Sequence, residues 1–145
     1  MSEIKEAEAG LLKEIDILCS IIEVKRSRIS ESLNELEKRV GKLQSTEKEM
    51  DSLMRREQEL RLNNQCVSGV RERLSLFKKE VILLNLGKSK KVEGLAIDKL
   101  QKIWDKFEDK RDEIEQVISD TAYMRLKKKF SELITSISFE ISKAA

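Results

Sequence analysis

The chain has 145 residues, of which 39% are charged and 4% are aromatic, and it contains neither proline nor histidine. Its 29 basic and 27 acidic residues nearly cancel, which argues against a dedicated nucleic-acid-binding domain, because such domains usually carry a basic excess on one face. The lack of histidine excludes the usual zinc-binding patterns, so we expect neither a metal nor another cofactor.

An amphipathic stretch dominates the first half of the chain. Its apolar residues recur every three or four positions, which is the period of one face of an α-helix. The stretch begins with Leu11, Ile15, Leu18, Ile22, Ile29 and Leu33, and it continues through Leu36, Val40, Leu43, Met50 and Met54. A stripe of this length must be covered by another helix. We therefore predict long coiled-coil helices and assign the first six residues to an interface with a partner chain.

One position of this stripe is polar. Between Ile22 and Ile29 the expected apolar position falls on Lys25. A polar residue in a helical seam can fix register or partner choice. The simpler interpretation is a lysine whose stem lies along the seam while its ammonium reaches water.

Two interpretations remain open between Gly41 and Thr46. Thr46 and Glu49 match a capping box, and Gly41 could end a helix, which together would give an elongated three-helix bundle. The stripe nevertheless continues through Leu43. We therefore favour one helix from about residue 3 to residue 86 and keep the three-helix bundle as the alternative.

The clearest loop lies between Gly87 and Gly94, and a last helix is expected from about residue 95 to residue 143. A short loop makes its flanking helices antiparallel neighbours. This register places Phe107 opposite Leu74 and Ile137 opposite Gln44, next to Leu43. The chain is then a single all-α unit, an antiparallel hairpin from which the first helix protrudes before about residue 39.

No motif in the sequence predicts catalysis, so we do not expect an enzyme. Gly87-Lys88-Ser89 resembles the end of a phosphate-binding loop, but residues 82–86 contain no glycine to wrap the phosphates. Cys19 and Cys66 have no histidine to act as a base, which favours structural thiols. Two isolated thiols, with neither a signal peptide nor a membrane-spanning segment recognised, predict an intracellular protein of the cytoplasm or nucleus.

The function predicted from the sequence is structural. We expect an assembly subunit that pairs through coiled coils with itself or with other helical chains, for example in a cytoskeletal, chromosome-associated or vesicle-tethering complex. The alternative is a binding module that uses a basic hairpin tip, formed by Lys88, Lys90 and Lys91, on nucleic acid, microtubules or an anionic membrane. Neither the partners nor the oligomeric state follows from the sequence.

Overall fold

The computed structural model describes residues 2–42, 47–86 and 94–144, and within these ranges all regular structure is helical. The helices are α1 (Ser2–Lys42), α2 (Glu47–Leu83), α3 (Gly94–Glu108), α4 (Arg111–Val117) and α5 (Asp120–Ala144). The all-α fold class predicted from the sequence is confirmed. None of the helices within the described ranges is long and apolar enough to cross a membrane.

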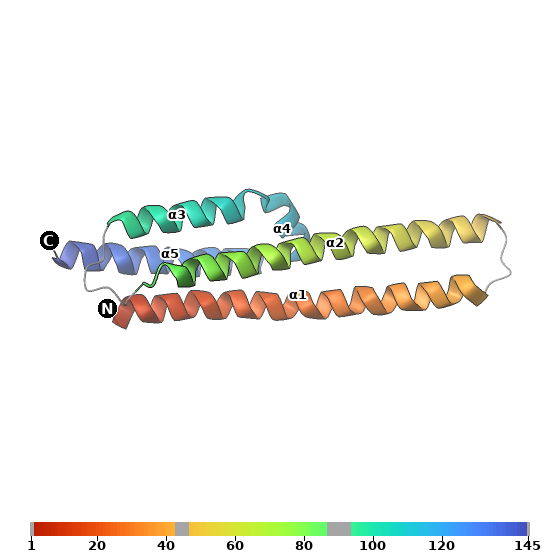
Figure 1. Cartoon of the computed structure of the whole chain (residues 1–145), viewed down its shortest axis with the longest axis horizontal. Coiled ribbons are helices and arrows are strands. Elements are labelled where there is room, and N and C mark those ends of the chain that lie inside the picture. The colour runs from red at the N-terminus through yellow and green to blue at the C-terminus, as the bar shows by residue number, and fades with distance from the viewer. Residues whose placement is uncertain (1, 43–46, 87–93, 145) are drawn as a thin grey trace.

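The two longest helices, α1 and α2, form an antiparallel hairpin (Figure 1). Three ion pairs bridge them and mark their register: Asp16 with Lys78 at 2.6 Å, Glu23 with Arg71 at 2.6 Å, and Glu37 with Arg61 at 3.1 Å. Because these pairs are largely exposed, each contributes little free energy. The stability of the hairpin must therefore come mainly from the apolar side chains buried between its helices and their neighbours.

The prediction of one continuous helix from about residue 3 to residue 86 is wrong. The chain reverses between Lys42 and Glu47, although residues 43–46 themselves lie outside the described residues. The reversal has a physical reason, since the apolar stripes of α1 and α2 shield each other in a hairpin but would face water in one long helix. At its other end α2 stops at Leu83, and Asn85 follows with a left-handed φ of 53°, a conformation common just beyond helix ends.

The described structure has two parts, a four-helix bundle and an arm. Helices α3 and α5 lie beside only one half of the hairpin, which consists of the N-terminal half of α1 and the C-terminal half of α2 (Figure 1). The other half projects as a two-helix arm, which we define as residues 30–42 and 47–62. Along the arm Leu36 is buried, whereas Leu33, Leu53 and Leu60 are only half-buried. The arm is therefore held by a narrower seam than the bundle.

The last third of the chain is not the single helix predicted for residues 95–143. Helix α3 ends at Glu108, α4 is only seven residues long, and α5 starts after a turn at residues 118–119. In this turn the Ser119 hydroxyl accepts a hydrogen bond from the backbone N–H of Ala122 at 3.1 Å. Serine is a favoured N-cap residue, so α5 begins with its own cap. The predicted loop falls mainly on residues 87–93, which lie outside the described part of the chain.

The turn before α5 decides what the last helix covers. Close to the predicted loop the register is nearly right, because the Phe107 ring lies 5.1 Å from that of Phe77, one helical turn from Leu74. Farther along the prediction is wrong, because α5 runs beside the first half of α1 (Figure 1). Leu43, the predicted neighbour of Ile137, lies outside the described residues. Lys129 lies against Gly10 at this contact, where a β-carbon would be 3.9 Å from the lysine Cδ. The N-terminal part of α1 consequently belongs to the bundle and does not protrude.

Five aromatic rings form the centre of the bundle, contributed by Phe77 of α2, by Trp104 and Phe107 of α3, and by Tyr123 and Phe130 of α5. Trp104 and Phe130 stack with their ring centroids 4.9 Å apart, and Phe77 meets Trp104 edge-on at 5.7 Å. Such contacts add to the stabilisation from burial alone. This aromatic cluster joins three helices, and the apolar side chains of α1 complete the core.

The buried phenol of Tyr123 makes the stability of the bundle depend on alkaline pH. Burial, with a further contribution from the Glu108 carboxylate, raises the pKa of Tyr123 to about 12, against an ordinary value of about 10. The unfolded chain therefore releases this proton at a lower pH than the folded chain. The stabilisation is complete below about pH 10 and is lost as the pH rises through about 12.

The test compares the wild-type chain with Tyr123→Phe by denaturant unfolding between about pH 9 and pH 12. Relative to the variant, the wild-type chain should lose roughly 2 kcal/mol over this interval, because only it can ionise at this position. A difference in unfolding free energy that stays constant with pH would contradict the prediction.

Candidate interaction surface on helix α1

The predicted partner interface divides between the bundle core and the base of the arm. Leu11, Ile15, Leu18 and Ile22 are each at most 1% exposed within the chain's own core. Helices α2 and α5 cover this face of α1, so these four side chains are not available to another chain in this fold. Ile29 and Leu33 are half-buried where the bundle gives way to the arm. The basic residues Lys88, Lys90 and Lys91 lie outside the described residues.

A second apolar row lies on the outer face of α1. Ile17, Ile21 and Val24 follow one another at spacings of four and three residues, which places them on one side of the helix. Their exposed fractions are 39%, 43% and 49%, although each is an immediate neighbour of a buried or half-buried residue. We call these three residues the α1 stripe. Single exposed apolar residues are ordinary on protein surfaces, but a row over successive turns is typical of a contact site.

No carboxylate of the adjoining segment is free to accompany the α1 stripe. Residues 13–28 contain only three, and each is paired with a cation of another helix. Asp16 and Glu23 turn toward α2, where they pair with Lys78 and Arg71. Glu14 is 6% exposed, and one of its oxygens lies 3.8 Å from the Arg125 guanidinium of α5. The outer face of α1 is thereby left without an unpaired carboxylate between residues 13 and 28.

Cations, in contrast, lie at both ends of the α1 stripe. Lys13 lies one turn before Ile17, and Arg28 lies one turn after Val24, and both are exposed. Within the described ranges neither forms an ion pair. Arg125 of α5 is half-exposed but pairs with Glu14, so the two charges offset each other. The surface is therefore a short apolar row with an exposed, unpaired cation at each end within the described residues.

Lys25, the polar residue of the predicted seam, has a structural role at the end of the bundle. Its ammonium donates a hydrogen bond to the backbone carbonyl of Val117, the last residue of α4. The final carbonyls of a helix have no partners within that helix, so Lys25 supplies one. It thus anchors the turn that leads into α5, and the interpretation of a lysine that merely reaches solvent is wrong.

A hollow of about 340 Å³ lies beside Lys25, where the bundle meets the arm. Arg28 and Gln116 line it, together with Cys66, whose thiol donates weakly to the carbonyl of Glu113 at 3.8 Å. Burial, followed by the nearby Glu113 carboxylate, raises the pKa of the Cys66 thiol. Cys66 is thus held as a thiol at the wall of this hollow, which favours a packing role over a nucleophilic one.

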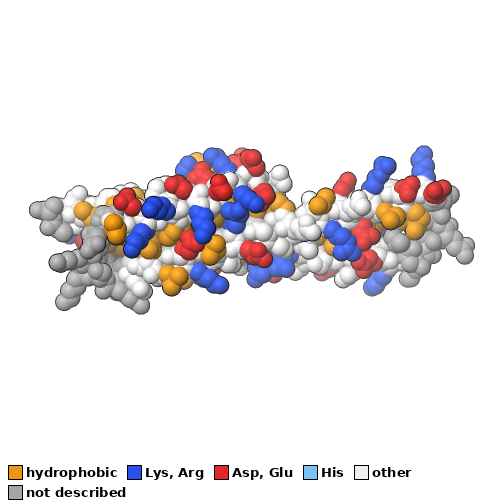
Figure 2. Space-filling model, turned by 45° about the horizontal axis from the view of Figure 1, so that its top comes forward, with side chains coloured by type: hydrophobic (Ala, Val, Ile, Leu, Met, Phe, Trp, Pro, Cys, Tyr) orange, Lys and Arg blue, Asp and Glu red, His pale blue; other side chains and the backbone are white. Residues whose placement is uncertain are grey.

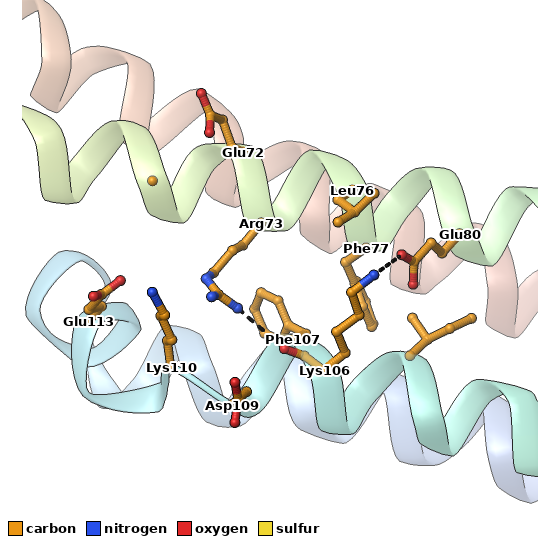
Figure 3. Close-up of a pocket in the computed structure, with 12 residues that line it drawn as sticks. Glu72, Arg73, Leu76, Phe77, Glu80, Lys106, Phe107, Asp109, Lys110 and Glu113 are labelled. Atoms are coloured by element: carbon orange, nitrogen blue, oxygen red, sulfur yellow. Dashed lines mark hydrogen bonds and ion pairs between the residues drawn. The ribbon is translucent and has the colours of Figure 1, made fainter.

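A groove of about 490 Å³ runs between α2 and α3 (Figure 3). Its apolar floor includes Leu76, Phe77 and Phe107, and Gly69 leaves a notch, since a β-carbon there would meet nothing within 4 Å. The charges along its walls are of both signs and partly satisfied within the chain. Lys106 pairs with Glu80 at 3.1 Å, and Arg73 donates to the carbonyl of Lys106 at 3.3 Å. This groove therefore offers no consistent charge to a ligand.

The surface seen in Figure 2 likewise mixes acidic and basic side chains over the bundle and the arm. Such alternation is typical of a solvated helical surface. Within the described residues, no three His, Cys, Asp or Glu side chains are placed to hold a metal ion. The α1 stripe combines three exposed apolar side chains at helical spacing with an exposed cation at each end.

Sequence reasoning missed the α1 stripe, although the signal was present. The pairs Ile17-Leu18 and Ile21-Ile22 place one apolar residue on each of two adjacent helix faces, which widens the apolar surface beyond a single coiled-coil seam. Only the structure separates the face that α2 and α5 cover from the face that stays open.

Comparisons with protein-family models, curated proteins and solved structures found no match.

Proposed function

We propose that this chain is a non-catalytic assembly subunit that acts through helix–helix contact with another protein, and that the α1 stripe is the contact surface. The observation that carries this proposal is the exposure of Ile17, Ile21 and Val24 in one row on a rigid helix. Covering a half-exposed residue of this type contributes roughly 1 kcal/mol. Three of them make a useful centre for an interface without making the free chain insoluble.

The α1 stripe is a better candidate than the arm. The apolar residues of the arm already face each other across the α1–α2 seam. Among the side chains described there, the large exposed apolar ones are Met54 and Leu62, and they lie on separate turns. Isolated residues of this kind need no partner. In this proposal the arm extends the molecule away from the bundle, and the bundle supplies the contact.

The reactive groups of the chain support a binding role. Cys19 is partly buried, and burial, followed by the charge of Asp16, raises the pKa of its thiol. A thiol held in the protonated form is a poor nucleophile. With Cys66 shifted in the same direction, both cysteines favour packing over chemistry.

The experiment places a photo-crosslinking amino acid at Ser20, an exposed position among the three stripe residues, in cells of the source organism. Irradiation should yield adducts of discrete mass, and Ile21→Asp should abolish them by placing a charge inside the contact. A crosslinker at the exposed Lys102 of α3 should not yield the same adducts.

The matched control for the loss is Met54→Asp, which introduces the same charge at an apolar residue of the arm that is 55% exposed, against 43% for Ile21. It should leave the Ser20 adducts intact. Adducts that survive Ile21→Asp, or no adducts at all, would refute the proposed contact surface.

A further inference from the structure

We propose that the partner of the α1 stripe is an acidic amphipathic helix. This inference rests on the function proposed above and adds the chemistry of the partner. It follows from two properties of the surface together, the helical spacing of its apolar row and the sign of the charge that surrounds it.

The charge argument starts from what the fold does with its own carboxylates. Every Asp and Glu between residues 13 and 28 is drawn toward α2 or α5, through Asp16–Lys78, Glu23–Arg71 and Glu14–Arg125. The cations Lys13 and Arg28 are left at the two ends of the row. A basic partner would bring like charges together, which costs more than a single exposed ion pair returns. The surface therefore selects against basic partners as much as it favours acidic ones.

The spacing argument identifies the shape of the partner. Side chains at spacings of four and three residues form a ridge that fits between the ridges of a second helix. From Lys13 to Arg28 the face is about 22 Å long at the helical rise of 1.5 Å per residue. A partner helix of about four turns would place its apolar residues on Ile17, Ile21 and Val24 and its carboxylates near the two end cations.

An anionic membrane is the other surface that combines apolar contact with negative charge, but the α1 stripe fits it less well. Membrane-surface helices insert a broad apolar face that commonly includes aromatic residues. The α1 stripe is one residue wide, contains no aromatic residue, and belongs to a helix whose broader apolar face is already buried in the bundle.

The test uses two fluorescent synthetic peptides that are each roughly 21 residues long, since shorter isolated helices are marginal in water. Both carry isoleucine or leucine at spacings of four and three residues. One has glutamate beside this apolar face, and the other has lysine. By fluorescence anisotropy at low salt, the full-length chain should bind the acidic peptide at least tenfold more tightly, and added salt should narrow the difference.

Three variants assign this binding to the α1 stripe. Ile21→Asp should abolish it, and the double variant Lys13→Gln with Arg28→Gln should weaken the acidic peptide severalfold while leaving the basic peptide unchanged or improved. The matched control, Arg55→Gln with Arg56→Gln, removes two exposed cations from the arm and should have no effect. Equal affinity for the two peptides would overturn the inference. So would a preference for the acidic peptide that the double substitution of Lys13 and Arg28 leaves unchanged.

Vesicles containing phosphatidylserine decide between a helix and a membrane. The chain should not sediment with them, and sedimentation that Ile21→Asp abolishes would overturn the inference in favour of a lipid surface. The two proposals can fail separately. Ile21-dependent adducts at Ser20 without an acidic preference would leave the assembly function standing and remove the acidic partner. An acidic preference without such adducts would support the acidic binding specificity of the α1 stripe and refute its use as an assembly contact in cells.

Discussion

Phe77→Ala should lower the free energy of unfolding by about 3–5 kcal/mol. The Phe77 side chain is 2% exposed, and its ring lies within about 6 Å of the rings of Trp104, Phe107 and Phe130. Truncation therefore leaves a cavity between α2, α3 and α5 that rigid helices cannot close. This is a large part of the total stability, because domains are commonly stable by only about 5–15 kcal/mol. The midpoint of thermal unfolding should therefore decrease by roughly 10 °C.

Trp104 provides the measurement, because it is the only tryptophan of the chain and stacks in the same cluster. Its fluorescence during denaturant unfolding reports the loss of that environment directly. The matched control is Leu76→Ala, at the neighbouring position, where the side chain is 45% exposed in the groove between α2 and α3. It should cost less than about 1 kcal/mol. Equal losses for the two variants would contradict the packing of α2 described above.

A second pair of adjacent substitutions should have opposite outcomes. Ile22→Asp places an unpaired carboxylate in the core, where Ile22 is fully buried, and this should cost more than about 4 kcal/mol and leave most of the chain unfolded. Ile21→Asp changes a residue of the α1 stripe to the same side chain and should alter stability by less than about 1 kcal/mol. The two faces of α1 are thereby distinguished by residues that are neighbours in the sequence.

Circular dichroism and size-exclusion chromatography would measure this contrast. The Ile22→Asp chain should lose helical signal and elute as an expanded species, whereas the Ile21→Asp chain should match the wild type. An unchanged Ile21→Asp chain would also show that its loss of binding is not caused by unfolding. A folded Ile22→Asp chain would mean that the core face of α1 has been assigned wrongly.

The apolar period predicted the helices well but not how they pair. The spacing of Leu11, Ile15, Leu18 and Ile22 correctly indicated a face that must be covered. It could not indicate whether another chain or another part of the same chain covers it, because a periodic stripe is the same in both cases. The covering helices are α2 and α5, and α5 begins about one hundred residues farther along. Such a contact leaves no local trace in the sequence.

The turns were missed for a related reason. The chain breaks at residues 109–110 and 118–119 without glycine or proline, and the apolar spacing continues across both sites. Helix breaks of this kind are set by what each side chain can bury on either side, which is a property of the packed bundle. The capping box of Thr46 and Glu49 did indicate the start of a new helix. The continuous apolar stripe favoured a single helix instead, and that prediction was wrong.

The contact between α1 and α5 has a consequence for synthesis on the ribosome. Helices α1 and α2 can pair as soon as both have emerged, since the hairpin requires only short-range closure of the chain. The buried face of α1, however, receives its full cover only from residues 120–144, the last described helix to be made. During the intervening elongation Leu11, Ile15, Leu18 and Ile22 stay partly open to solvent, and a nascent chain in that condition is a natural client for chaperones. The bundle therefore completes itself by the docking of its final helix.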